Sequence, residues 1–412
     1  MNLLIRIVVV CFLVVVSDVY FYRILNRVFC GTVKQRRWLK IGIALLLLLF
    51  IIFEMGVVVV VGYPEDNYVK YRQLFLLLDA FMLVYLPKAL VALVLMGMDV
   101  GWLCIKLGKA MMGRKKLRRL PKGVFVGALA LYVVFLGITV YGFVYEKTDV
   151  KLKKVDVWCD KLPRGFDGFT IVQISDVHLG SFTQTNTIAR SVEMINAAKP
   201  DMFVCTGDMI NVSDKEMTPY IPLMAEIRAP YGKFSILGNH DIGDYFTLKK
   251  PKNQEAITKN LIANEQKMGW VVLIDSGCYI HKAGDSMALI GVNNCGSFPF
   301  RHSGDVGKAM RGIGASDFKV MLSHDPDLWE NEIVGKTDIG LTLSGHTHAM
   351  QLALICELFQ VSPSMFKYKE WYGLYQQGGQ QIYVNPGLAY SGFAGRIGTR
   401  PEITVITLRA KK

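Results

Sequence analysis

The sequence predicts a chain in two parts: about four transmembrane helices over residues 1–145, then an α/β domain. Three observations support this division. The hydrophobic share of the 412 residues is 52%, which is high for a wholly soluble protein, and the excess lies before residue 146. The positive charge gathers in the same region. After residue 146, short apolar runs alternate with polar turns that contain glycine, as in α/β domains.

Four apolar stretches make up the predicted membrane region. Residues 41–63 and 124–145 are each long enough to cross a bilayer, and they hold one charged residue and none, respectively. A third span covers residues 74–98. The first stretch, residues 3–20, is similar to a signal peptide in position and length, but no small-residue cleavage site follows it, so we expect a retained helix.

Charge is distributed unevenly along the chain. Residues 1–145 hold 18 lysines and arginines against 6 acidic residues, whereas residues 146–412 hold 29 against 28. The basic residues cluster at 23–40 and 106–123, between predicted spans, and such loops stay in the cytoplasm. Both chain ends are then expected outside the cytoplasm, with the domain facing the periplasm or the cell exterior. The lipid bilayer is the expected partner of the basic loops, and no nucleic acid is expected, because the domain itself is nearly neutral.

Three ionisable residues, Glu54, Asp79 and Lys88, lie inside the predicted spans. Such residues often serve transport or a proton relay, and the alternative is that Asp79 and Lys88 pair within the bundle or lie near helix ends. A membrane transporter or sensor whose second domain only binds ligand is therefore an alternative function. The eight cysteines include no CxxC, and five of them follow residue 146, so we expect buried thiols and not a disulfide framework.

Polar residues with metal-binding side chains follow the predicted strands of the α/β domain. The apolar runs FTIVQIS, MFVCTG, GKFSILG, MALIGV, KVMLSH and IGLTLSG are expected to be buried strands. The groups at strand ends are Asp176, His178, Asp208, Asn239, His240, Asp241, His324, His346 and His348. Carboxylate, amide and imidazole ligands without thiolate suit divalent Mn, Fe or Zn. Two such ions, roughly 3.5 to 4 Å apart, could clamp a phosphoryl group.

Taken in order, DVH, GD, GNHD, a later H and GHTH resemble the five motifs of the calcineurin-like metallophosphoesterases. The resemblance covers about residues 168–408, and stretches such as GFTIVQISDVHLG are similar to the membrane-anchored bacterial branch. It implies a two-sheet β-sandwich flanked by helices. We expect residues 146–167 to be a linker and leading strand, and residues 168–412 to be the metallophosphoesterase domain.

The resemblance also implies ligands for two divalent metal ions. One ion would take Asp176, His178 and His348, the other Asn239, His324 and His346, and Asp208 would bridge the two. His240 would be the catalytic residue, facing the scissile phosphate to stabilise charge or protonate the leaving oxygen. A metal-bound hydroxide would attack in line.

Two positions depart from the family's motifs. Many relatives have GDxxD, in which the second Asp can orient the catalytic histidine, but this chain has Asn211 there. Either Asp241 or another carboxylate is then expected to orient His240, or the histidine is less basic than in those relatives. Met350 replaces the glycine that usually follows GHTHA, which would leave a narrower or more apolar pocket.

The substrate is predicted from the segment after the last metal motif. Phe366, Tyr368, Trp371 and Tyr372 lie there, and they either pack over the sheet or enter the lipid interface. Arg396 is a candidate phosphate contact, with a surface salt bridge as the alternative. We expect a membrane-anchored phosphodiesterase or pyrophosphatase that acts on phospholipid or lipid-linked head groups. A broad phosphomonoesterase acting on soluble substrates is the alternative.

Overall fold

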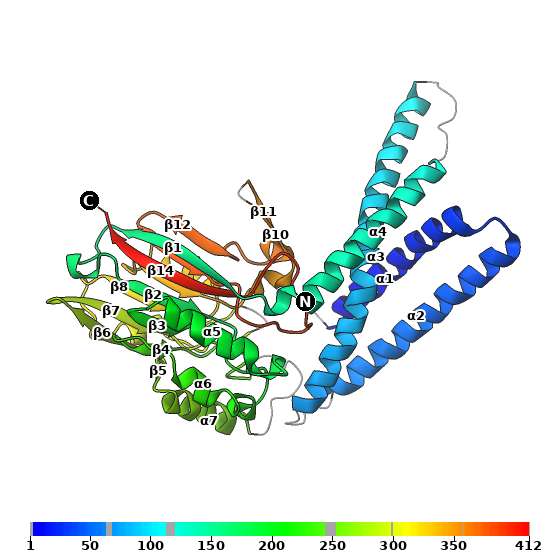
Figure 1. Ribbon diagram of the computed structural model, residues 1–412. Coiled ribbons are helices and arrows are strands. Elements are labelled where there is room, and N and C mark those ends of the chain that lie inside the picture. Colours follow the sequence, from blue (N-terminus) through cyan, green and yellow to red (C-terminus); the bar gives the residue numbers. More distant parts are fainter. Residues whose placement is uncertain are drawn as a thin grey trace. The chain divides into compact units, whose positions relative to one another are not determined.

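The computed structural model describes residues 3–62, 68–112, 120–243, 253–297, 300–356 and 358–411. The chain divides into two compact units (Figure 1). The helical unit consists of Met1–Tyr63 and Gln73–Tyr141, and the sheet unit consists of Pro64–Arg72 and Gly142–Lys412.

The helical unit is built from long helices, each of which contains a predicted span. They are α1 (Leu3–Phe29), α2 (Val33–Gly62), α3 (Tyr68–Met111) and α4 (Lys122–Val144). Two described stretches, Leu76–Met111 and Lys122–Thr148, are long and apolar enough to cross a membrane by length and composition. A region with four membrane-crossing helices therefore stays a prediction.

Charged side chains inside the helical unit meet partners on other helices. The Lys88 ammonium of α3 lies 2.9 Å from the Asp18 carboxylate of α1, so Lys88 pairs with Asp18 and not with Asp79. Closer to the ends of the same two helices, Arg23 pairs with Asp99. The side chain of Glu54 lies outside the described residues.

The sheet unit contains two six-stranded mixed sheets and one two-stranded hairpin. The first sheet has the order β1 (Lys151–Cys159), β14 (Glu402–Ala410), β2 (Thr170–Ile174), β3 (Met202–Cys205), β4 (Lys233–Ser235), β5 (Val271–Val272). The second has the order β12 (Gly373–Gln377), β13 (Gln380–Val384), β9 (Leu341–Ser344), β8 (Lys319–Leu322), β7 (Asp285–Gly291), β6 (Ser276–Lys282). The hairpin pairs β10 (Leu354–Ile355) with β11 (Gln360–Val361). All six apolar runs expected to be strands coincide with strands of these two sheets.

A shared hydrophobic core joins the two six-stranded sheets. Ile171 and Val204 of the first sheet belong to the same buried cluster as Leu289, Val320 and Leu343 of the second. Strands β2, β3 and β4 are parallel, as are β7, β8 and β9. Continuous apolar runs suit such strands, because both faces of each sheet are covered.

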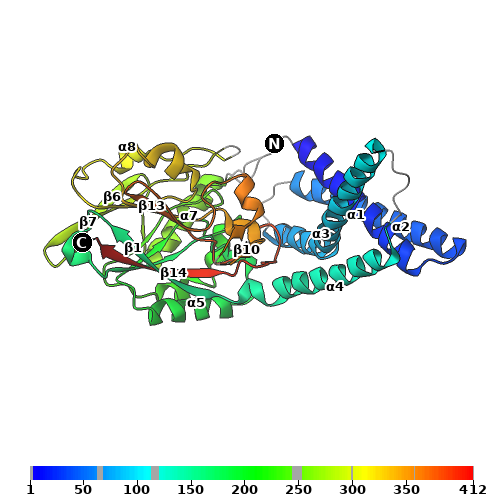
Figure 2. The same ribbon diagram turned by 90° about the horizontal axis from the view of Figure 1, so that it is seen from above.

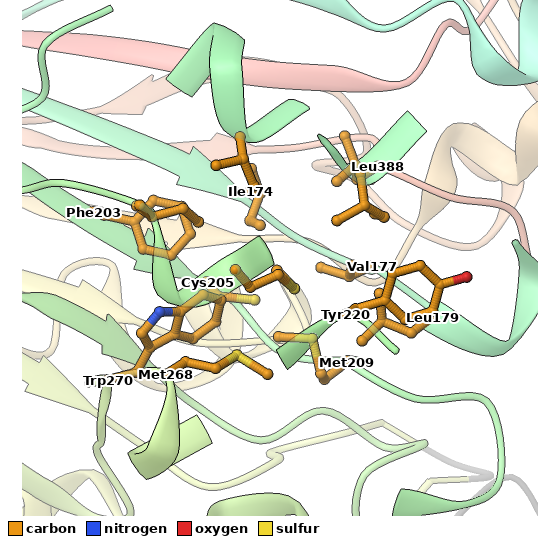
Figure 3. Packing of buried hydrophobic residues seen from close by; sticks show 14 of the residues in the cluster. Ile174, Val177, Leu179, Phe203, Cys205, Met209, Tyr220, Met268, Trp270 and Leu388 are labelled. Atoms are coloured by element: carbon orange, nitrogen blue, oxygen red, sulfur yellow. The ribbon is translucent and has the colours of Figure 1, made fainter. Parts of the chain in front are cut away.

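Helices cover the outer faces of the two sheets. A second core packs the first sheet against α5 (Asn186–Ala197), α6 (Ile221–Ala225) and α7 (Gln254–Lys267), and Figure 3 shows part of it around Phe203 and Trp270. A third core packs the second sheet against α8 (Val306–Ala309) and a π-helical turn, Trp329–Ile333. Figure 2 shows α5 and α8 on opposite sides of the two sheets. The shorter 3-10 turns are Glu146–Thr148, Arg164–Phe166, Leu179–Ser181, Asp214–Met217, His348–Gln351 and Pro363–Phe366.

Candidate metal centre

The predicted ligands follow the C-terminal ends of five parallel strands. Asp176 and His178 follow β2, Asp208 follows β3, Asn239 and His240 follow β4, His324 follows β8, and His346 and His348 follow β9. Both six-stranded sheets contribute, and a hydrogen bond from Gln173 Nε2 to Ser344 O (2.9 Å) ties their edges together. All eight side chains are buried or nearly so, the side chains of His346 and His348 being 6% and 10% exposed. Parallel strand ends therefore place the eight groups at one buried edge.

A first donor group is formed by Asp176, His178 and His348, whose ligand atoms all lie within 4.8 Å of one another. The two Nε2 atoms of His178 and His348 are 3.1 Å apart. His348 Nε2 is also 3.1 Å from Asp176 Oδ1. Three atoms with lone pairs thus converge on one point.

A second donor group is formed by Asp208, His324 and His346, again with ligand atoms within 4.8 Å of one another. His324 Nε2 is 3.2 Å from Asp208 Oδ2 and 3.2 Å from His346 Nδ1. The amide oxygen of Asn239 lies 3.2 Å from the same His324 nitrogen. Asn239 therefore belongs beside this second group, as the sequence predicts.

Asp208 lies between the two groups. Its Oδ2 is 3.2 Å from His324 Nε2 in the second group and 3.7 Å from His178 Nε2 in the first. Its other oxygen, Oδ1, accepts the backbone N–H of His240 at 2.9 Å. One carboxylate oxygen is thus fixed by the backbone while the other faces both groups.

Hydrogen bonds behind the histidines decide which ring nitrogen faces the centre. His178 Nδ1 lies 3.3 Å from Ile210 O, and His324 Nδ1 lies 2.7 Å from Thr206 O. A carbonyl can only accept, so in both rings Nδ1 donates and Nε2 is left with its lone pair for a ligand. His346 is turned the other way, because its Nε2 lies 3.0 Å from the hydroxyl of Tyr368 and its Nδ1 faces His324.

These residues fit divalent metal ions. Asp176 Oδ1 is buried and faces the ligand nitrogen His348 Nε2 at 3.1 Å without a well-formed hydrogen bond, although buried carboxylate oxygens are normally satisfied. Facing imidazole nitrogens 3.1 Å apart likewise require either a shared proton or a cation between them. The donors are imidazole, carboxylate and amide, the set expected for Mn, Fe or Zn.

Electrostatics at the edge keeps most of the ligands in their binding forms. Burial, with the neighbouring His240, lowers the pKa of His178 to about 3, so this ring is neutral at physiological pH. Burial opposes ionisation of Asp208, yet His324 and His240 hold its pKa well below the usual range. His324 is the exception, since burial lowers its pKa but Asp208 raises it to about 10. Protons and metal ions therefore compete for His324.

The backbone is strained at this edge. Among the described residues, the ligands with left-handed backbone are Asp176, His178, Asp208, His346 and His348, with φ between 39° and 70°. The glycine before His346 has a separate steric reason, because a Cβ at Gly345 would overlap the side chains of Ser175 and Asp176. Such strain persists where the surrounding structure over-determines it, typically at functional sites.

His240 lies beside the first donor group. Its ring makes an edge contact with His178, with centroids 4.6 Å apart. His240 Nδ1 lies 2.8 Å from the backbone carbonyl of Asn211 and donates to it. The residue that replaces the family's second aspartate therefore still holds the histidine, through its main chain.

The expectation that Asp241 orients His240 is wrong. The Asp241 carboxylate accepts the backbone N–H groups of Gly238, Asp208, Met209 and Ile210. Burial and the nearby Asp208 raise its pKa to about 7. Asp241 thus fastens the loops after β3 and β4 to each other.

Glu216 is a supporting residue that the sequence prediction missed. Its buried carboxylate accepts four backbone N–H groups, those of Gly180, Asn211, Val212 and Ser213, at 2.7 to 3.1 Å. It therefore fixes the Asn211 peptide that holds His240. The signal was present, because Ser213 and Glu216 form the S-x-x-E capping box of a short helical turn.

The aromatic segment after the metal motifs is divided between the core and the surface. Tyr368, Trp371 and Tyr372 are buried, so the expectation that these rings enter the lipid interface is wrong. Tyr368 instead contacts His346, and Lys367 donates to its hydroxyl. Phe366 alone of the four named rings is exposed, at 88%.

The surroundings of Arg396 and Met350 differ from those that the sequence predicted. Arg396 is fully buried, and its guanidinium donates to backbone carbonyls of the 386–389 turn and Thr399. This favours a structural role beside Asp176 over the predicted phosphate contact. Met350 has a φ of 46°, which explains why glycine is common there, and its side chain is 39% exposed. A pocket narrowed by Met350 stays a prediction.

The fold and this edge define a class, and comparison with known proteins agrees. Residues 169–350 match the family model described as calcineurin-like phosphoesterase. The chain belongs to the calcineurin-like metallophosphoesterase family.

Three relatives illustrate the range of the family. The chain is 32% identical to the Bacillus subtilis protein named "Uncharacterized metallophosphoesterase YkuE", over 73% of this chain and 99% of the relative. It is 28% identical to the "Transmembrane protein with metallophosphoesterase domain" of Danio rerio, over 74% of this chain and 68% of the relative. It is 25% identical to the "Uncharacterized metallophosphoesterase Cj0846" of Campylobacter jejuni, over 76% of this chain and 78% of the relative.

Proposed function

We propose that the protein is a membrane-anchored phosphoesterase with two divalent metal ions, and that it cleaves a phosphodiester or pyrophosphate bond of a phospholipid or lipid-linked head group. The observation that supports this most is the pair of donor groups that meet at Asp208, beside His240. The family membership makes phosphoester hydrolysis the expected reaction.

Two metal ions would supply a hydroxide near neutral pH and neutralise charge on the phosphate. One ion would be held by Asp176, His178 and His348. The other ion would be held by Asn239, His324 and His346, and Asp208 would bind both ions. The imidazole, carboxylate and amide donors favour Mn, Zn or Fe.

The residues around the ions have separate tasks. Asp208 sets the spacing of the two donor groups, because its Oδ1 is fixed on the His240 backbone and its Oδ2 faces both. His240 donates Nδ1–H to Asn211 O, so the proton delivered to the leaving oxygen would come from Nε2. Strand-end carbonyls keep His178 and His324 in the tautomer whose Nε2 faces the centre, and Tyr368 orients the ring of His346.

Membrane anchoring is supported by two apolar helical stretches, Leu76–Met111 and Lys122–Thr148, and by the name of the Danio rerio relative. The basic segments at 23–40 and 106–123 favour an extracytoplasmic location of the sheet unit, at a bacterial inner membrane. A metal edge on that side would meet lipid-linked head groups of the outer leaflet.

The test is hydrolysis by the full chain in detergent, stripped of metal and refilled with Mn, Zn or Fe. Bis-p-nitrophenyl phosphate should be cleaved faster than p-nitrophenyl phosphate. Asp208→Ala and His240→Ala should each lower diester cleavage by at least about 100-fold. His302→Ala is the matched control, because that exposed histidine pairs with Glu332 outside the centre.

Other outcomes favour other functions. Faster cleavage of the monoester would support the broad phosphomonoesterase. A folded chain that binds metal but cleaves neither substrate would support the transporter or sensor whose second unit only binds ligand.

A further inference from the structure

An exposed apolar surface lies on the sheet unit, on the hairpin β10–β11 and the turn after it. Its members are Leu354, Leu358, Phe359, Val361, Met365 and Phe366. We call this surface, within residues 354–366, the apolar hairpin. Leu358 is 92% exposed and Phe366 is 88% exposed, while the other four are between 46% and 61% exposed.

This concentration differs from ordinary surface composition. Single exposed hydrophobic residues are normal on any protein, but contiguous groups mark surfaces that bind a protein, a ligand or a membrane. The strand β11 is exposed at both of its residues, so the hairpin adds little to the core. Its apolar side chains are therefore not explained by folding of the sheet unit.

The hairpin is attached next to the end of a candidate membrane helix. Leu352 forms a parallel bridge with Ile397, and Ala353 N donates to Ile397 O at 2.9 Å. The residue before Ile397 is Arg396, whose backbone N–H donates to Gly142 O in the last turn of α4 at 3.3 Å. The neighbouring residues Arg396 and Ile397 thus contact both the end of α4 and the base of the hairpin.

Further contacts fix the end of α4 on the sheet unit. The ring of Phe143 stacks on that of Phe393, with centroids 5.8 Å apart. Glu146, just after the helix, accepts the backbone N–H of Gly398 at 3.0 Å. The helix end, the 393–398 segment and the hairpin base are all parts of the sheet unit, so their relation is set within one compact body.

The segments just before and just after the apolar hairpin belong to the metal centre. It starts six residues after the ligand His348, and the chain returns from it to Tyr368, whose hydroxyl lies 3.0 Å from His346 Nε2. Figure 1 shows β10 and β11 projecting from the sheet unit beyond the two large sheets. The surface that is exposed and apolar is therefore also the surface nearest in sequence to the predicted ligands.

We propose that the apolar hairpin inserts into the lipid interface beside α4 and brings lipid head groups to the metal centre. The proposal deepens the proposed function and rests on it for the substrate, but the insertion itself is independent of catalysis. The bilayer is the proposed occupant, because the candidate membrane span that contains α4 ends at residues held by the same 396–398 segment as the hairpin base.

Lipid contact can be measured by photo-crosslinking of the full chain in proteoliposomes. The photoreactive p-benzoylphenylalanine replaces Leu358 or Phe366 in the hairpin, and Trp158, which is 52% exposed on β1, in the control. Several-fold more labelled lipid should attach at the two hairpin positions than at the control. Equal yields at all three positions, or attachment to a second protein chain in place of lipid, would overturn the proposal.

The consequence for substrate access is tested by the double variant Leu358→Ser with Phe366→Ser. The ratio of cleavage of a vesicle-borne lipid diester to cleavage of bis-p-nitrophenyl phosphate should fall several-fold. Val271→Ser, at an exposed position of β5, is the control and should keep the ratio. An unchanged ratio in the double variant contradicts the proposal.

The two hypotheses can fail separately. If the wild-type chain cleaves no diester at all, the proposed function fails, and the crosslinking result still decides whether the hairpin meets lipid. If the chain cleaves soluble diester but the hairpin positions label no lipid, the hairpin proposal fails while the phosphoesterase stands.

Discussion

Two buried clusters of ionisable residues, one in each unit, are arranged in opposite ways. In the helical unit, the Lys88 ammonium lies 2.9 Å from the Asp18 carboxylate, and the Tyr85 hydroxyl lies 3.4 Å from the same carboxylate. The ammonium also lies over the rings of Phe21 and Tyr85. The lysine charge is therefore balanced within the cluster by one carboxylate and by two aromatic rings.

The metal centre of the sheet unit is different, because its side chains are not paired off with one another in this way. Asp176 and Asp208 are joined there by histidines whose ligand nitrogens face one another, and Asp176 Oδ1 faces His348 Nε2 without a well-formed hydrogen bond. A buried cluster that is closed by its own charges is structural, whereas one that leaves donors converging on a point requires a ligand.

The largest expected effect is on the closed cluster. Asp18→Asn leaves Lys88 as a buried unpaired cation, so the full chain in detergent should lose about 3–5 kcal/mol of stability, read as a fall in its unfolding temperature. The exchange of the pair, Asp18→Lys with Lys88→Asp, should restore part of the loss. Asp99→Asn is the control, since the Arg23–Asp99 pair is about one-third exposed and should cost about 1 kcal/mol or less. An equal loss of stability in Asp18→Asn and Asp99→Asn would contradict the expectation that the buried pair matters more than the exposed one.

The second effect concerns the open cluster. Mn or Zn at 100 times its dissociation constant should stabilise the metal-stripped chain by about 2.7 kcal/mol, because the ion binds only the folded state. Asp208→Ala, which removes the carboxylate shared by both donor groups, should abolish most of this gain. Thermal unfolding with and without metal measures it. The same gain in the variant would show that the ion binds elsewhere.

A third variant probes a buried carboxylate that is satisfied by neither a cation nor a metal. Glu216→Gln places an amide group against two of the four backbone N–H donors, so stability should fall by about 2 kcal/mol. Diester cleavage should fall about tenfold with a shifted pH profile, because the Asn211 peptide positions His240. Glu193→Gln, on the exposed side of α5, is the control. A loss of stability with an unchanged pH profile would restrict Glu216 to a structural role.

The smallest effect, taken per pH unit, is a pH dependence at Glu265, a buried carboxyl whose partner is the Ser235 hydroxyl. Burial, with Asp241, raises its pKa to about 8, from 4.5 in the unfolded chain. The folded state therefore binds more protons between pH 4.5 and 8, and stability falls as the pH rises through this window, by at most about 1.4 kcal/mol per pH unit. Glu265→Gln should make the decline shallower in unfolding temperatures taken from pH 5 to 8. An identical slope in the variant would contradict the assignment.

The site ligands were predictable because strand ends are local features of the sequence. Asp176 and Asp208 each come directly after a buried apolar run, and parallel strands bring their carboxyl ends to one edge. The supporting residues were harder to predict. Glu216 and Tyr368 reach the centre through hydrogen bonds from other loops, and no local pattern states which loop lies behind which ligand.

Two expectations failed for a related reason. The sequence offered Asp241 as the partner of His240, but at that turn the carboxylate lies against four backbone N–H groups. It also offered Arg396 as a phosphate contact, but the 386–389 turn surrounds the guanidinium with carbonyls. In both cases the side chain could have served the predicted role at the site, but in the structure its hydrogen bonds hold backbone groups together.

The sequence by itself determined the order of apolar helices and strands and the types of the residues at the strand ends, because hydropathy patterns and side-chain chemistry are properties of neighbouring residues. Only the tertiary structure decided that Asp208 faces both donor groups, that Asn211 holds His240 through its backbone, and that Tyr368 is buried while Leu358 and Phe366 are exposed. These depend on contacts between segments far apart in the chain, which local patterns do not encode.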